Sequence, residues 1–532
     1  MSGGFRLALA ALLLATTATV ARAAPTRIDA GLIEGVTLPS GVRAWFGVPF
    51  AAPPVRELRW RPPQTVEPWR GVLHTERPAP MCLQALRSRT MNHYFGNEAT
   101  SEDCLYLNVW APPRGTRHPV LVWIYGGGFT VGSASMANYS GESLARAGVV
   151  RVNIAYRLGA LGFLAHPELS REDSAGVSGN YGLLDQIAAL RWVQRNIARF
   201  GGDPANVTIV GQSAGSASVA LLQSSPAARG LFHRAVGMSG SPFAPPMLTV
   251  PLAVAEQEGV ALQKALGADS VEALRDIAGD RVLAAATRQN STLVAGGHAL
   301  PATPQQLFES RRHSDVPLIL GITRDESFLP LGPIGSVADY QAAIERAFPR
   351  NAAQVLGAYP AQDAASAIRA ATDVARDASM GLAMWRWAEL QHRHGKAQVY
   401  TYFFTRRQPY AAGIRFVDHD PATAGAYHSG EIPYFLGTRE SLNLFRHTRD
   451  WGPIDDALEQ DMSELLHSFA RDGKPRSPRV PDWPAFDANQ PQVLRLGEQL
   501  GVTEWPNHRA LPLLDGAVFP GAAPAGTGRV RD

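Results

Sequence analysis

The sequence predicts an α/β protein with a mostly parallel, twisted sheet that is covered by helices on both faces. Apolar segments of strand length alternate along the chain with helical segments. The clearest helical segment, residues 180–200, spaces its apolar side chains with a helical period. With 532 residues, of which 45% are hydrophobic, the chain can also bury a large core. Strands that alternate with helices form a parallel sheet with two covered faces.

The six expected strands share a run of Val, Ile, Leu, Tyr or Phe of strand length. They are expected within residues 118–129, 148–157, 206–213, 233–241, 316–326 and 397–407. Functional sites of such sheets lie at the carboxyl ends of the strands, so the residues after each run are the first candidates for chemistry.

Two long segments, near residues 250–312 and 338–395, are rich in helix and lack strand patterns. We interpret them as helical insertions that form the walls of a substrate pocket. The chain shows no internal repeat and no low-complexity linker. Residues 24–532 are therefore expected to form a single domain.

The first 23 residues have the pattern of a secretory signal peptide. Arg6 precedes an apolar stretch over residues 7–20, and Ala21 and Ala23 supply the small residues of a cleavage site. A membrane anchor is the alternative, but the stretch is short and no basic flank follows it. We expect a periplasmic or secreted protein, cleaved near Ala23, with no transmembrane segment in the mature chain.

Cysteine content and charge limit the function further. Cys82 and Cys104 are the only cysteines and lie about twenty residues apart, which in an exported protein favours a disulfide over two free thiols. The formal net charge is +3, and no run of Lys and Arg forms a basic stripe. We therefore expect no nucleic-acid partner.

Ser213 is the main candidate for a nucleophile. It lies in Gly-Gln-Ser-Ala-Gly (residues 211–215), between an expected strand and an expected helix. This strand-turn-helix setting is the one that a nucleophile elbow requires, because its sharp turn leaves no room for side chains two positions from the serine. The alternative is a small residue at an ordinary tight turn.

A glycine run supplies a candidate oxyanion hole. Gly126, Gly127 and Gly128 directly follow an expected strand, and the N–H of Ala214 lies at the start of a helix. A phosphate-binding loop is the alternative, but the spacing and lysine of such loops are missing.

Candidates for an acid and a base follow the serine in the required order. Asp325 and Glu326 end one expected strand, and His419 and His428 come after the next one. The spacing alone does not choose within either pair.

At this point the chain resembles the type-B carboxylesterases, a family of the α/β-hydrolase fold that includes bacterial p-nitrobenzyl esterases, mammalian carboxylesterases and cholinesterases. The matching segments occur in order over nearly all of the chain after the leader. They are residues 46–64, 101–112, 123–134, 153–164, 179–216 and 428–437.

The resemblance implies a Ser-His-Glu triad of Ser213, His428 and Glu326, and no metal or organic cofactor. It places the oxyanion hole at Gly127, Gly128 and Ala214. It also implies a disulfide between Cys82 and Cys104, and a hydrogen-bond network behind the triad that includes Ser239 and Glu431. The pairs Arg59 with Glu102 and Arg157 with Asp185 match structural ion pairs of the family.

Departures from the cholinesterases bear on the substrate. The loop between the cysteines carries His93, Tyr94 and Phe95 but no tryptophan, and Gln212 stands where cholinesterases have glutamate. Choline esters are therefore not expected as substrates. Phe243 and Met247 are candidates for the acyl pocket.

The resemblance implies a serine carboxylic-ester hydrolase that cleaves small to medium, fairly apolar esters through an acyl-enzyme intermediate. One alternative is a specialised esterase for a polyester, a mycotoxin side chain or a feruloyl sugar. The other is a binding protein without catalysis on the same fold. The expected partner is a small-molecule ester.

Overall fold

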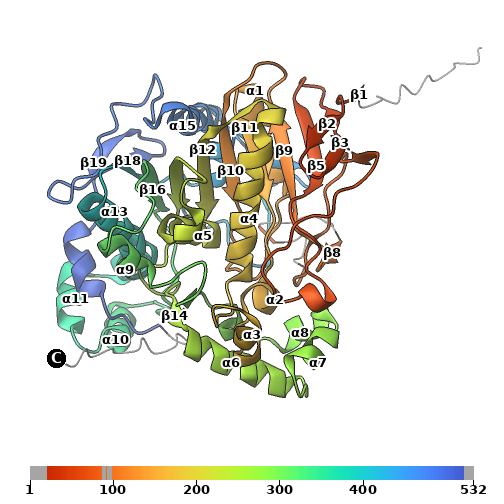
Figure 1. The fold of residues 1–532 in the computed structure, drawn as a ribbon. Helices are drawn as coiled ribbons and strands as arrows, with labels where there is room; N and C mark the ends of the chain where they lie inside the picture. Colours follow the sequence, from red (N-terminus) through yellow and green to blue (C-terminus); the bar gives the residue numbers. More distant parts are fainter. Residues whose placement is uncertain (1–20, 87–90, 93–98, 520–532) are drawn as a thin grey trace, which may run out of the picture.

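The computed structural model describes residues 21–86, 91–92 and 99–519. Its centre is a twelve-stranded sheet with the order β1-β4-β5-β9-β11-β10-β12-β13-β16-β17-β18-β19. Helices surround this sheet: in Figure 1, α4 and α5 lie in front of it and α15 lies behind it. The predicted fold class, a mostly parallel sheet between helices, is confirmed.

All six predicted strands are present, and they are neighbours that pair in parallel. Every residue of β16 and β17 is buried, which explains why these strands appear in the sequence as continuous apolar runs. The six are β10 (His118–Ile124), β11 (Val150–Ile154), β12 (Gly202–Gln212), β13 (Arg234–Met238), β16 (Leu318–Thr323) and β17 (Val399–Phe404).

Further strands complete the sheet, most of them through antiparallel pairs at its two sides. They are β1 (Ala21–Arg22), β4 (Val36–Thr37), β5 (Arg43–Pro49), β9 (Tyr106–Ala111), β18 (Gln492–Leu496) and β19 (Gly501–Glu504). Two of the three small sheets outside it are formed by β2 (Thr26–Ile28), β3 (Gly31–Glu34) and β6 (Val72–His74), and by β7 (Met81–Cys82) and β8 (Thr100–Ser101).

The long helix α4 (Tyr181–Asn196) continues as a 3₁₀ turn to Phe200, as the periodicity predicts. Its buried face packs against the sheet, and α5 (Ala214–Ser224) is buried along its whole length. The other helices of the main body are α1 (Glu142–Arg146), α2 (Gly159–Phe163), α3 (Pro167–Glu172), α14 (Ile432–Leu436) and α15 (Pro453–Asp472).

The two predicted insertions are helical. The first contains α6 (Leu252–Ala265), α7 (Val271–Asp276), α8 (Gly279–Ala285) and α9 (Pro304–Glu309). The second contains α10 (Val337–Ala347), α11 (Ala352–Ala358), α12 (Ala364–Arg376), a π-helical turn (Asp377–Gly381) and α13 (Leu382–His394).

One expectation about the first insertion was wrong, because it contains a pair of strands, β14 (Val250–Pro251) and β15 (Val294–Ala295). Two residues each are too short to leave a strand pattern in the sequence. In Figure 1, α6, α7, α8 and α10 gather at the lower end of the molecule, where α2 follows the carboxyl end of β11. These parts of the insertions thus lie at the end of the sheet where sites of this fold class form, whereas α13 packs against β16 and β17.

The described chain begins at the edge of the sheet. Ala21 and Arg22 pair with Thr37 and Val36, and the N–H of Ala23 donates to the carbonyl of Gly35 at 3.0 Å. Cleavage after Ala23 would therefore remove β1. Among the described helices, none has the length and apolar character needed to cross a membrane.

Candidate active site

Ser213 lies in the turn between β12 and α5, with φ of 57° and ψ of −124°. This ψ lies outside the left-handed helical region that most non-glycine residues with positive φ occupy, so the backbone of Ser213 is strained, and such strained residues cluster at functional sites. A Cβ atom at Gly211 would lie 2.2 Å from the carbonyl oxygen of Gly215, and one at Gly215 would lie 2.0 Å from that of Ile124. The turn therefore needs both glycines, as expected for a nucleophile elbow.

The glycine run after β10 faces this turn. A Cβ atom at Gly126 would lie 2.9 Å from Cβ of Ser213. Gly127 and Gly128 have φ of 115° and 61°. Within residues 21–86, 91–92 and 99–519, the N–H groups of Gly127, Gly128 and Ala214 have no hydrogen-bond acceptor. Three unused donors beside a serine are what an oxyanion hole needs.

Glu326 and His428 form a close pair. Nδ1 of His428 lies 2.6 Å from Oε2 of Glu326, while Oε1 of Glu326 accepts from the N–H of Thr323 at 3.0 Å. The Glu326 side chain is fully buried, whereas that of His428 is 24% exposed and can meet a substrate. Phe328 packs edge-on against the imidazole, with ring centroids 4.8 Å apart.

Asp325, the other candidate acid, has different partners. Its carboxylate accepts from Arg369 Nη1 at 2.6 Å, Arg324 Nε at 2.9 Å and the N–H of Ala426 at 2.7 Å. Burial alone would raise the pKa of Asp325, but the hydrogen bonds from Arg369 and Ala426 bring it below its ordinary value. Asp325 therefore joins the turn that carries Glu326 to the loop that carries His428.

The second insertion also contacts this turn. Arg369 and Arg376 both lie on α12. Arg376 is buried and donates from Nη1 to the carbonyl of Arg324 at 3.1 Å. The acid turn is thus held from the insertion side as well as by the loop of His428.

His419, the other candidate base, has no hydrogen bond to either carboxylate among the described residues. Its ring nitrogen contacts the hydroxyl of Tyr410, and its ring packs against Tyr427. Burial, followed by the nearby Arg449, lowers the pKa of His419. The geometry therefore favours His428 as the partner of Glu326.

The hydroxyl of Ser213 makes no hydrogen bond to His428 in the described part of the chain. The side-chain nitrogen of Gln212 lies 3.0 Å from Nε2 of His428 and 3.5 Å from Nδ1, so it lies beside the ring and not in line with the Nε2 lone pair. Because Nδ1 donates to Glu326, this lone pair is the one that can accept a proton from Ser213. Hydrogen bonds between nucleophile and base often form only when substrate is bound.

Behind the pair lies a second buried carboxyl group, Glu431. Burial and the nearby Glu326 raise the pKa of Glu431 to about 8. The hydroxyl of Tyr402 donates to its Oε1 at 3.4 Å. Ser239 is fully buried, and neither its Oγ nor Oε2 of Glu431 has a hydrogen-bond partner among the described residues. The contact behind the pair is therefore made by Tyr402, which the sequence reasoning missed, and not by Ser239.

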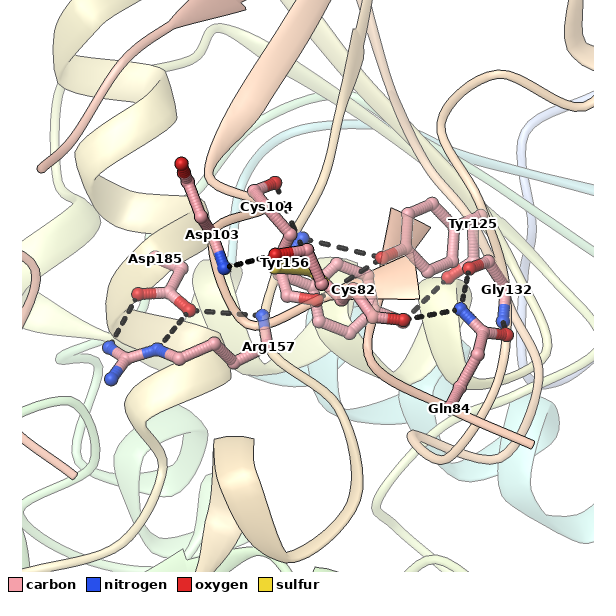
Figure 2. Close-up of a disulfide and its surroundings, with 10 residues drawn as sticks. Cys82, Gln84, Asp103, Cys104, Tyr125, Gly132, Tyr156, Arg157 and Asp185 are labelled. Atoms are coloured by element: carbon pink, nitrogen blue, oxygen red, sulfur yellow. Dashed lines mark hydrogen bonds and ion pairs between the residues drawn. A yellow bond between two sulfur atoms is a disulfide. The ribbon is translucent and has the colours of Figure 1, made fainter. Parts of the chain in front are cut away.

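Near the site, Cys82 and Cys104 form a disulfide (Figure 2). The expected ion pairs are also present. Arg157 and Asp185 meet at 2.7 Å with both side chains buried, and Arg59 and Glu102 meet at 2.6 Å. The first pair is fully buried and the second is partly exposed at Glu102, next in the chain to the disulfide segment.

Two sets of residues are candidates for substrate binding. His93, Tyr94 and Phe95 lie outside the described residues. Phe243 is 2% exposed and packs edge-on against Phe308, with centroids 5.3 Å apart. Met247 is partly buried against the same core.

The fold and this site define an α/β-hydrolase. Comparison with known proteins narrows the class: the model of the carboxylesterase family matches residues 22–511. Fumonisin B1 esterase from Sphingopyxis macrogoltabida is 35% identical, over 90% of this chain and 87% of its own length. Phenmedipham hydrolase from Pseudarthrobacter oxydans is 35% identical, over 87% of this chain and 93% of its own.

A solved structure of a PNB esterase superimposes with a TM-score of 0.78 at 29% identity, covering 92% of this chain and 99% of that one. The chain therefore belongs to the carboxylesterase family, and it is a carboxylic ester hydrolase. The predicted resemblance, fold and enzyme class are confirmed.

Proposed function

We propose that Ser213, His428 and Glu326 form the catalytic triad of this esterase. His428 takes the proton of Ser213 as its oxygen attacks the ester carbonyl, and Glu326 holds the imidazole and stabilises its charged form. The oxyanion is stabilised by the N–H groups of Gly127, Gly128 and Ala214. The alcohol leaves with the proton from His428, and water then hydrolyses the acyl-enzyme in the same way.

The observation that carries this proposal is the 2.6 Å contact between His428 and Glu326. It lies beside a serine in a strained turn, and Gln212 bridges the two because it precedes Ser213 and contacts His428. A nucleophile, a base and a group that orients the base are the parts that acyl transfer requires.

The proposed substrates are small to medium, fairly apolar carboxylic esters. Gln212, beside Ser213, carries no charge, so this position offers no anion to bind a cationic alcohol group. Relatives of similar identity are named for fumonisin B1 and for phenmedipham, and this variety does not favour one ester. The fumonisin B1 esterase supports the narrower alternative, a specialised esterase.

We further propose that the chain is exported after cleavage near Ala23 and that residues 24–532 form one domain, with the insertions as pocket walls. The disulfide between Cys82 and Cys104 supports an oxidising compartment. Fractionation of expressing cells, with N-terminal sequencing of the product, tests this. A protein that keeps residues 1–23 in the cytoplasm would contradict it.

The triad is tested by labelling with an organophosphate and mapping the adduct by mass spectrometry. We expect the adduct on Ser213 and no labelling of Ser213→Ala. An adduct elsewhere, or an active and labelled Ser213→Ala variant, would overturn the assignment. A series of p-nitrophenyl esters of increasing acyl length then separates a closed acyl pocket, with a sharp optimum at short chains, from an open groove.

A further inference from the structure

The loop that carries Gly127 and Gly128 is held by a side chain from another segment. Nε2 of Gln84 donates to the carbonyl of Gly132 at 2.7 Å, and Oε1 of Gln84 accepts from the N–H of Gly132 at 2.8 Å. Figure 2 shows this pair of bonds beside the disulfide. One amide side chain thus binds both polar backbone groups of a single residue in the loop.

Gln84 is itself fixed in place. It follows Cys82 by two residues, and the disulfide ties Cys82 to Cys104, just before β9. Nε2 of Gln84 also donates to the carbonyl of Cys82 at 2.9 Å, and the residue is only 8% exposed. Leaving a buried amide without hydrogen-bond partners is unfavourable, so the three hydrogen bonds of Gln84 keep its side chain in this orientation.

Gly132 packs directly behind the proposed oxyanion donors. A Cβ atom at Gly132 would lie 2.6 Å from the carbonyl oxygen of Gly126 and 2.3 Å from the ring of Tyr125. The next residue back, Val131, donates its N–H to the carbonyl of Gly127 at 3.1 Å. A shift of Gly132 would therefore move the backbone that presents the donors.

The other end of the loop is held independently. Tyr125 and Tyr156 stack with centroids 4.5 Å apart, and the hydroxyl of Tyr156 donates to the carbonyl of Tyr125 at 2.8 Å. Gln84 is one side chain that fixes the far end, and just beyond it Asn153 donates to the carbonyl of Ala134 at 3.0 Å. Donors that are already in place stabilise an oxyanion without reorganisation in the transition state.

We propose that Gln84 is a positioning residue for the oxyanion hole, acting through Gly132 and not by contact with substrate. This rests on the proposed function. The consequence is that loss of the Gln84 bonds weakens transition-state stabilisation more than it weakens substrate binding.

The test uses two substitutions in the full-length enzyme. Gln84→Met keeps the volume and removes both bonds to Gly132, whereas Gln84→Glu keeps an acceptor for the N–H of Gly132. We expect Gln84→Met to lower kcat for p-nitrophenyl acetate by about ten- to a hundredfold, with KM changed by less than about twofold. The kcat of Gln84→Glu should lie between that of the wild type and that of Gln84→Met. The Ki of a trifluoromethyl ketone, which forms a tetrahedral adduct with the serine, should rise in parallel with the loss of kcat.

Gln186→Met is the matched control, since Gln186 is also buried and donates from Nε2 to Oγ of Ser218 at 3.0 Å, on α4 and outside both insertions. It should lower Tm and leave kcat and Ki near wild type. Equal effects of Gln84→Met and Gln186→Met on kcat and Ki would overturn the proposal. If Gln84→Met does not accumulate, an unchanged kcat and Ki for Gln84→Glu would overturn it.

Failure of the triad is distinguishable from failure of this proposal. An organophosphate adduct on Ser213 in the wild-type enzyme, with normal kcat and Ki in both Gln84 variants, removes only the role of Gln84. Absence of that adduct removes the triad, whatever the Gln84 variants do.

Discussion

The two halves of the proposed triad are held in different ways. The serine half is local, since Gly211 to Gly215 fix the turn through contacts between backbone atoms. The acid-base half is assembled from distant segments, because Glu326 and His428 lie 102 residues apart and Asp325 and α12 join them through side chains. The first half therefore depends on backbone sterics and the second on hydrogen bonds and charge, so substitutions should affect them differently.

The largest expected effect removes the nucleophile without disturbing its turn. Ser213→Ala should lower kcat by more than about ten-thousandfold, because triad members act as a unit. Its Tm should stay near wild type, because alanine adds no atoms to the turn. Steady-state hydrolysis and a thermal melt test both statements. If Ser213→Ala instead has a Tm so low that the protein is unfolded under assay conditions, the serine has a structural role.

The next effect separates the two neighbouring carboxylates. Glu326→Gln should lower kcat by about a thousand- to ten-thousandfold, since the amide cannot stabilise the charged imidazole. Asp325→Asn should cost far less in kcat, because an amide oxygen can still accept from the N–H of Ala426. Measured kcat values for the two variants, with folding checked by circular dichroism, decide between them. Equal losses of kcat in the two variants would contradict the assignment of Glu326, and not Asp325, as the acid of the triad.

A third prediction tests the backbone-held half. Gly211→Ala should destabilise the protein by at least about 3 kcal/mol, because its Cβ would overlap the carbonyl of Gly215. Gly357→Ala, in α11, is the control: a Cβ there meets nothing within 4 Å, and alanine should stabilise the helix by up to about 1 kcal/mol. Urea unfolding measures both changes. Similar stability of the two variants would show that the elbow tolerates side chains.

The last effect, which is the smallest over any single pH unit, concerns the buried carboxyl group behind the acid. The pKa of Glu431 is raised from 4.5 to about 8. Below about pH 4.5 it is protonated in both the folded and unfolded states. Between there and about pH 8 the unfolded group ionises first, so its contribution to stability falls as pH rises. Glu431→Gln should therefore gain stability relative to wild type by about 1 kcal/mol per pH unit in that window.

Thermal or urea unfolding of both proteins at pH 5, 6, 7 and 8 measures this slope. A difference between the two proteins that stays constant with pH would contradict it. Because Glu431 lies beside Glu326, the same result would show how the enzyme tolerates two carboxyl groups at this point.

The serine half could be predicted from the sequence and the other half only in part. Residues 206–215 contain both the strand and the glycines that shape the elbow, so the elbow follows from adjacent residues. Asp325 and Glu326 look equivalent in the sequence, because what distinguishes them is the position of Arg369 and His428 in space. Gln84 had no local signal either, since its partner Gly132 lies 48 residues away. Strand β9 was missed although its sequence, YLNVWA, is an apolar run of strand length like those of the central strands.

The contacts of α12 with the acid turn limit how freely the second insertion can be exchanged. Arg369 and Arg376 belong to a segment that is proposed to shape the pocket, yet they bind Asp325 and the carbonyl of Arg324. A chimera that takes residues 337–394 from a relative, in order to change acyl preference, must keep both arginines in register with the recipient's turn. We therefore expect an exchange of this segment to change substrate preference and kcat together.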